Sequence, residues 1–280
     1  MKTFWIRTVS AVVYVLLFLG SMFSGVLLGN EKVGMLIFGA FLLFVTIGCS
    51  FEFFRMVRLQ GACPSELLGY FYAILTLLLV MFVPLMGLKG FSVTLTAYTL
   101  FPAIFALSVI LQLWHHSEQP FRDAAYTLIP LLYIALPLSL MMAVMSSHGA
   151  MVLFLLVALV WVNDSGAYIG GSLFGRHKMW ERHSPGKTWE GTVFGVAVSI
   201  LLAVCVGPWV TNIGWYHWFV LGVICSVVDT LGDLVESMLK RSVSVKDSGN
   251  IMPGHGGFLD RFDSLLIIMP FAYAYLTLVV

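Results

Sequence analysis

The sequence predicts an all-α, polytopic integral membrane protein with about nine transmembrane helices. Three observations support this fold class. Hydrophobic residues make up 60% of the 280 residues. Only 10% of the residues are charged, against about 25% in an ordinary soluble domain. Apolar stretches of about 20 residues, the length of a helix that crosses a bilayer, recur along the whole chain.

The candidate spans follow one another through short polar loops. The first span comes after Lys2 and Arg7, as in a secretory signal, but it has no small-residue cleavage motif and further spans follow. We therefore interpret it as an anchor. The expected spans cover residues 8–28, 33–54, 67–88, 92–113, 124–146, 150–172, 189–210, 217–236 and 264–280.

Charge and cysteine content exclude several classes of protein. The small charged fraction and large apolar fraction exclude a disordered protein, a nucleic-acid binder and a conventional water-soluble enzyme. A net charge of +1 gives no long-range field for an acidic partner. The four cysteines have no CxxC or CxxH spacing, which argues against a zinc site and against a disulfide scaffold.

The distribution of Lys and Arg predicts the orientation, because these residues accumulate in cytoplasmic loops. With a cytoplasmic N-terminus, only Lys32 and Lys89 of the 15 basic residues fall on the opposite side, and the C-terminus lies outside. The cytoplasmic set is Lys2, Arg7, Arg55, Arg58, Arg122, Arg176, Lys178, Arg182, Lys187, Lys240, Arg241, Lys246 and Arg261.

The acidic residues divide the chain into an N-terminal part expected to be a scaffold, residues 1–148, and a C-terminal part expected to carry the function, residues 149–280. The acids of the first part lie near predicted span ends or in loops, where a charge costs little, so we expect them to be solvated or interfacial. They are Glu31, Glu52, Glu66, Glu118 and Asp123. The C-terminal part has two polar loops that are expected to be cytoplasmic, 173–188 and 237–263.

Several acids of the second part interrupt apolar spans. A carboxylate at the centre of a membrane helix costs about 2.5–3.5 kcal/mol and needs a compensating partner. Offsets of 4, 7 and 11 residues place Asp229, Asp233, Glu236 and Lys240 on one helical face. Carboxylates so spaced can bracket a hard cation. The alternative is a structural network with Lys or Arg of neighbouring helices.

The two polar loops combine glycine with basic residues, a composition typical of phosphate binding. The segment Pro185-Gly186-Lys187-Thr188 suggests a P-loop, but that motif needs glycine at position 181, where this chain has Glu181. A P-loop is therefore rejected, while a contact of Lys187 with phosphate stays a hypothesis.

Residues 237–241 (SMLKR), 246–247 (KD) and 253–263 (PGHGGFLDRFD) resemble the signature of the phosphatidate cytidylyltransferases, also called CDP-diglyceride synthetases. Residues 164–168 (DSGAY), 184–188 (SPGKT) and 232–233 (GD) are also similar to that family. Met252 departs from it by a conservative apolar exchange. The N-terminal half matches only in being hydrophobic.

The resemblance implies an enzyme that joins CTP and phosphatidate to give CDP-diacylglycerol and pyrophosphate. It further implies one or two divalent cations such as Mg²⁺, with a monovalent cation as a further possibility, and a homodimer. In a bacterium the enzyme would lie in the inner (plasma) membrane with its active site facing the cytoplasm.

Phosphoryl transfer depends on positioning and charge stabilisation, which accounts for a site that mixes acids and bases. A phosphate oxygen of phosphatidate, already ionised at neutral pH, would attack the α-phosphorus of CTP without a general base. We therefore expect His255 to donate to a phosphate oxygen. Three roles are open for Asp164: a metal ligand, a partner for a basic residue, or a contact to cytosine or ribose.

The resemblance and the spacing together give three sets of expected site residues. The expected metal ligands are Asp229, Asp233, Asp260 and Asp263. The expected catalytic residues are Lys240, Arg241, Lys246, Asp247, His255 and Arg261, and the expected substrate-binding residues are Asp164, Ser184, Gly186, Lys187, Thr188, Gly256 and Gly257.

The main alternative from another class is a cation-coupled transporter whose ion path uses Asp164, Asp229 and Asp233, because acids within the membrane mark ion pathways. The concentration of acids in one half argues against it, since an inverted repeat would place a matching set in the other half. A purely structural membrane protein explains neither polar loop.

The charge distribution makes a topology prediction. In a chain from which Cys49, Cys63, Cys205 and Cys225 have been removed, Asn212→Cys should react with an impermeant thiol reagent added from outside. Ser184→Cys should react only after permeabilisation. The reverse labelling would overturn the orientation.

Overall fold

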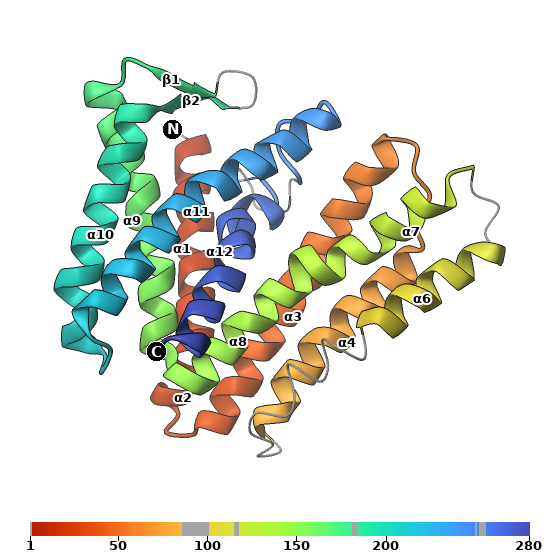
Figure 1. Cartoon of the computed structure of the whole chain (residues 1–280), viewed down its shortest axis with the longest axis horizontal. Helices are drawn as coiled ribbons and strands as arrows, with labels where there is room; N and C mark the ends of the chain where they lie inside the picture. The colour runs from red at the N-terminus through yellow and green to blue at the C-terminus, as the bar shows by residue number, and fades with distance from the viewer. Residues whose placement is uncertain (1, 86–100, 115–117, 181–183, 250, 252–255) are drawn as a thin grey trace. The chain divides into compact units, whose positions relative to one another are not determined.

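The computed structural model describes residues 2–85, 101–114, 118–180, 184–249, 251 and 256–280, and this part is largely helical (Figure 1). The helices are α1 (Lys2–Met22), α2 (Ser24–Leu27), α3 (Glu31–Leu59), α4 (Glu66–Leu85), α6 (Phe101–Leu111), α7 (Pro120–Ile129), α8 (Leu136–His148), α9 (Ala150–Phe174), α10 (Trp189–Val210), α11 (Trp215–Ser242) and α12 (Leu259–Leu278). A 3-10 turn, Gln112–Trp114, follows α6, and a π-helical turn, Pro130–Ala135, joins α7 to α8.

Six helical segments of the described part are long and apolar enough to cross a membrane, which confirms the predicted all-α multi-span fold. They are Glu31–Leu59, Pro120–His148, Ala150–Phe174, Trp189–Val210, Trp215–Ser242 and Leu259–Leu278, with shorter apolar helices at Thr8–Met22 and Glu66–Phe82. The count of nine stays a prediction, because part of the expected span 92–113 lies outside the described residues.

Two predicted loops contain more regular structure than expected. Helix α11 continues to Ser242 and α12 begins at Leu259, so the expected loop 237–263 is much shorter. The segment 173–188 includes an antiparallel hairpin of β1 (Lys178–Trp180) and β2 (Ser184–Thr188). The sequence analysis ended the spans at charged residues. A charged residue ends an apolar stretch but not a helix, because the backbone hydrogen bonds of the helix do not depend on apolar side chains.

The chain forms two compact units. Unit 1 comprises Met1–Ser146 together with Asp247–Arg261, and unit 2 comprises Ser147–Lys246 together with Phe262–Val280. The first change of unit falls close to the predicted boundary after residue 148, while residues 247–261 group with the N-terminal helices. The functional division into scaffold and catalytic domain stays a prediction.

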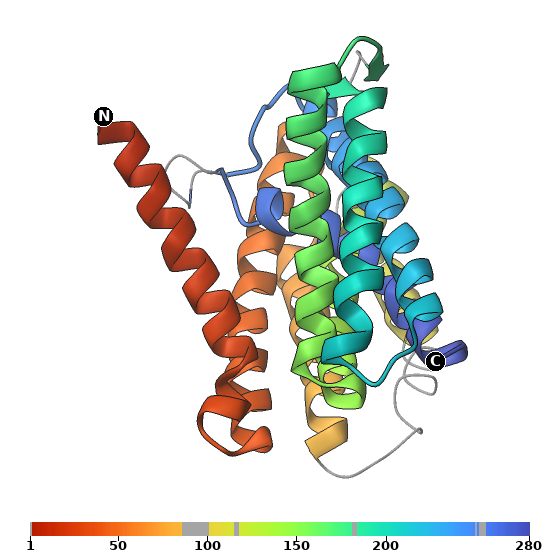
Figure 2. The ribbon, with the colours of Figure 1, turned by 90° about the vertical axis from the view of Figure 1, so that its left-hand side faces the viewer.

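In unit 1, α2 joins α1 to α3, and the two long helices converge there (Figure 2). Aromatic side chains fill the contact between these helices: Phe18 of α1 lies 6.3 Å from Phe38 and 5.8 Å from Phe41 of α3, measured between ring centroids. Gly34 lies directly against the backbone of Gly25, and a Cβ atom at Gly34 would collide with the Gly25 backbone.

Two acids of unit 1 correct the expectation that this half carries only solvated or interfacial carboxylates. Glu52 and Asp123 are each 1% exposed. Asp123 accepts a hydrogen bond from the backbone N–H of Cys63 at 3.2 Å and forms an ion pair with Arg122 at 3.3 Å. Hydrogen-bond donors from distant parts of the chain stabilise these buried carboxylates. The sequence alone does not reveal which distant residues come close to them.

In unit 2, glycines allow α9 and α10 to pack side by side with their backbones in contact (Figures 1 and 2). A Cβ atom at Gly195 of α10 would lie 2.6 Å from the carbonyl oxygen of Asn163. A Cβ atom at Gly166 of α9 would lie 3.0 Å from the Cα of Gly195. Small residues at such positions are how membrane helices approach closely.

This packing predicts the effect of adding a single methyl group. Gly195→Ala should destabilise the protein by about 1–3 kcal/mol, because the rigid backbone of Asn163 occupies the space. Gly20→Ala is the matched control, since a Cβ at Gly20 of α1 meets no atom within 4 Å. Thermal unfolding in detergent measures both variants, and equal midpoints would contradict the proposed contact.

Candidate active site

Unit 2 contains a cavity of about 400 Å³ whose wall is formed by α9, β2, the start of α10 and α11. This volume is within the range of about 300–1,000 Å³ that is usual for small-molecule sites. The cavity brings together all the expected substrate-binding residues of segments 164–168 and 184–188. Its lining residues are Asn163, Asp164, Ala167, Tyr168, Ser184, Gly186, Lys187, Thr188, Thr192, Thr230 and Asp233.

The hairpin and the start of α10 position the cationic side of this cavity. Thr188 caps α10 by accepting a hydrogen bond from the N–H of Gly191 at 3.2 Å. The preceding residue, Lys187, places its Nζ atom 2.5 Å from Oδ2 of Asp233 and 3.4 Å from the carbonyl oxygen of Thr230. The cavity therefore contains an ammonium group held between β2 and α11.

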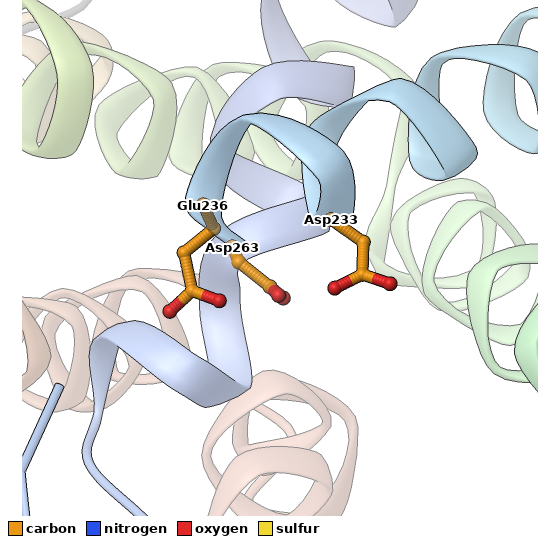
Figure 3. Close-up of side chains that lie close together, drawn as sticks. All are labelled: Asp233, Glu236 and Asp263. Atoms are coloured by element: carbon orange, nitrogen blue, oxygen red, sulfur yellow. The ribbon is translucent and has the colours of Figure 1, made fainter. Parts of the chain in front are cut away.

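Asp233 also belongs to a cluster of three carboxylates, defined here as the acidic cluster: Asp233 and Glu236 of α11 and Asp263 of α12 (Figure 3). One ligand oxygen of each lies within 4.8 Å of the other two. The three side chains extend to the same side, with Asp263 between the other two (Figure 3). Hard cations such as Mg²⁺ prefer oxygen ligands of this kind, so these residues could hold one.

A close approach of α11 to α12 makes this cluster possible. A Cβ atom at Gly232 would lie 3.3 Å from the Cα of Ser264, tighter than ordinary van der Waals contact. The residues next to these two, Asp233 and Asp263, are members of the cluster. Glu236 is 1% exposed and is in contact with Lys240 one turn further along α11, as the helical spacing predicts.

Asp229 lies one turn before Asp233 on α11 and is fully buried. Its Oδ2 atom accepts a hydrogen bond of 2.7 Å from Nδ2 of Asn163, whereas its Oδ1 atom has no hydrogen-bond partner in the part of the chain that the structure describes. Asp229 is thus linked to the cavity wall through Asn163 and is not a member of the acidic cluster.

Asp260 belongs to unit 1, within residues 247–261, which we name the signature segment. Its Oδ2 atom accepts hydrogen bonds from the N–H of Ser248 at 2.9 Å and from the N–H of Gly257 at 2.8 Å, and the hydroxyl oxygen of Ser248 also lies 2.9 Å from it. Gly256 has φ +84°, a conformation that favours glycine, and a Cβ there would lie 2.5 Å from Oδ2 of Asp260. In unit 1 the two glycines thus shape the backbone around Asp260.

The remaining predicted residues that the structure describes lie at the end of α11 or in exposed positions. Lys240 and Arg241 lie in the last turn of α11 instead of in a loop. Arg241, Lys246, Asp247 and Arg261 are exposed, and Arg241 donates to the carbonyl oxygen of Val245 at 3.4 Å. His255 lies outside the described residues, so its predicted role stays a prediction.

Asn163 and Glu236 were not among the predicted site residues. Asn163 directly precedes Asp164 in an apolar helix. A polar side chain at such a position indicates a site residue, but the sequence analysis considered only the neighbouring carboxylate. Glu236 was assigned to the right helical face but not to the metal ligands, although its position three residues after Asp233 places both on the same side.

Fold and site together define an all-helical, multi-span membrane protein with a polar cavity next to a cluster of carboxylates. The sequence matches the Cytidylyltransferase family over residues 5–279, so the chain belongs to this family. Transporter function receives no support from this match.

Bacterial relatives match a shorter part of the chain. A phosphatidate cytidylyltransferase of Staphylococcus saprophyticus is 42% identical over 151 residues, which are 54% of this chain and 58% of the relative. The phosphatidate cytidylyltransferase of Bacillus subtilis is 44% identical over 136 residues, or 48% of this chain and 50% of the relative. The chain thus matches between about half and three-fifths of the length of these relatives.

The contact between Lys187 and Asp233 predicts coupled stability effects. Lys187→Met and Asp233→Asn should each change the free energy of unfolding, and the double variant should differ from their sum by about 0.5–1 kcal/mol, since both side chains are only partly exposed. Chemical unfolding of the four proteins measures this coupling. Additive effects would show that the two charges do not interact in solution.

Proposed function

We propose that the chain transfers a cytidylyl group from CTP to phosphatidate, giving CDP-diacylglycerol and pyrophosphate. The observation that carries the proposal is the position of Asp233, which lines the cavity and is also a member of the acidic cluster. One site thereby offers a nucleotide-sized cavity, a lysine for phosphate and carboxylates for a cation. The names of the relatives support the same substrates.

We further propose that the acidic cluster holds Mg²⁺, as its all-oxygen donor set favours. Asp233, Glu236 and Asp263 would be the protein ligands, while the ligand roles of Asp229 and Asp260 stay predictions from the sequence. When bound, the cation would neutralise phosphate charge that otherwise opposes the approach of two anionic substrates.

The basic residues would bind the substrates directly. Lys187 lines the cavity, so its ammonium group is available to a phosphate of CTP in exchange for part of its contact with Asp233. Asp164 lines the same cavity and keeps the three roles that the sequence leaves open: metal ligand, partner for a basic residue, or contact to cytosine or ribose. His255 would donate a hydrogen bond to a phosphate oxygen, and Arg241, Lys246 and Arg261 would attract the headgroup of phosphatidate from their exposed positions.

The cellular setting is part of the proposal. The thirteen-to-two distribution of basic residues supports an active site that faces the cytoplasm, where CTP is available. In a bacterium this places the enzyme in the plasma membrane. We also propose a homodimer, as the family resemblance implies.

The direct test is the reaction itself. The purified chain in detergent, given labelled CTP, phosphatidate and Mg²⁺, should form a labelled CDP-lipid. Asp233→Asn and Asp263→Asn should each lower turnover by about 100-fold or more, because each removes charge from the proposed cation site.

Glu66→Gln is the control for these variants. Glu66 is an acid of unit 1 that forms an exposed ion pair with Arg58 at 2.7 Å, so its loss should leave turnover within about twofold. Absence of a CDP-lipid with the wild-type chain would contradict the proposed function. Normal turnover of Asp233→Asn at saturating Mg²⁺ would instead remove Asp233 from the cation site.

A further inference from the structure

Glu52 of α3 is a buried carboxylate that the proposed reaction does not use. It is 1% exposed, and three donors from the signature segment and the start of α12 surround it. Its Oε2 atom accepts from the hydroxyl of Ser248 at 2.8 Å and from the N–H of Leu259 at 2.9 Å. Its Oε1 atom accepts from the N–H of Phe258 at 3.0 Å.

Two of these donors belong to the start of α12. The first N–H groups of a helix have no partner within the helix, and a carboxylate there also interacts favourably with the helix dipole. A residue just before the helix usually supplies this cap. Here Glu52 supplies it from 207 residues away in the sequence, as the separation from Leu259 shows.

The backbone of the signature segment is closely fitted to this carboxylate. A Cβ atom at either Gly249 or Gly257 would collide with the carboxylate of Glu52. Arg55, one turn after Glu52 on α3, donates to the carbonyl oxygen of Ser248 at 3.1 Å. One face of α3 therefore binds the segment through an acid and a base.

Ser248 connects Glu52 to Asp260. The hydroxyl oxygen of Ser248 lies 2.8 Å from Oε2 of Glu52 and 2.9 Å from Oδ2 of Asp260, and its N–H donates to the same Oδ2 atom. The position of Ser248, and with it the N–H that donates to Asp260, thus depends on contacts to α3.

We propose that Glu52 is a positioning residue: it caps α12 from α3 and, through Ser248, fixes the orientation of the Asp260 carboxylate without touching a substrate. Helix α12 carries Asp260 in its first turn and Asp263 three residues later, so the cap sets the starting point of the helix that bears both acids. The catalytic consequence rests on the proposed function, whereas the capping does not.

The test compares Glu52→Gln with Asp123→Asn in the purified full chain. Glutamine keeps the size of Glu52 but replaces one acceptor oxygen by an NH₂ group. The NH₂ group cannot accept from an N–H of Phe258 or Leu259, so one of these hydrogen bonds is lost. We expect turnover to fall by about 10- to 100-fold, the half-activating Mg²⁺ concentration to rise several-fold, and the KM for CTP to change by less than about twofold. Glu52→Asp should recover part of this loss.

Asp123 is the matched control, since it is equally buried in unit 1 and also accepts a backbone N–H. Asp123→Asn should lower the melting temperature while Mg²⁺ activation stays unchanged. Ser248→Ala keeps the amide contacts of Glu52 but removes the bridge, so it should raise the half-activating Mg²⁺ concentration with little change in melting temperature.

A second readout does not depend on activity. Hydrogen exchange of the Phe258 and Leu259 amides should accelerate by at least about tenfold in Glu52→Gln and stay unchanged in Asp123→Asn. Unchanged exchange, or normal Mg²⁺ activation in an active Glu52→Gln protein, would overturn the positioning role. A wild-type chain that forms no CDP-lipid would refute the proposed function alone, and the exchange rates would still decide the capping.

Discussion

A carboxylate enclosed by apolar helices must receive hydrogen-bond donors or cations, and the described structure is organised around this requirement. Burial of an ionised acid without partners costs several kcal/mol, a large share of the net stability of a protein. Glu52 obtains its donors from the signature segment, Asp229 from Asn163, and Glu236 from Lys240. Glu52 and Asp229 thereby join segments that lie far apart in the sequence, whereas Glu236 and Lys240 lie one turn apart on α11.

The glycines make these connections possible. A donor can reach a buried acid only if the backbone that carries it comes close, and at Gly257 and Gly195 a side chain would occupy the necessary space. The same explanation applies to Gly232, where α11 approaches α12 beside two members of the acidic cluster. These glycines thus serve the close approach of backbone to neighbouring groups, whereas phosphate binding by the loop glycines stays a prediction.

The sequence was sufficient for properties that depend on composition and on local spacing. It predicted the multi-span helical fold, the face of α11 that carries Asp233, Glu236 and Lys240, and the segments whose residues line the cavity. It failed where an interaction joins distant residues. The expectation for Glu52 was wrong because its partners lie 196 to 207 residues further along, and no local pattern reveals such a distance.

The two lysine contacts of the acidic cluster have a consequence for biogenesis. Lys187 and Lys240 supply positive charge to two of the three carboxylates from within the chain. Unit 2 therefore packs these two acids with part of their counter-charge already in place, which lowers the cost of burying them as its helices assemble.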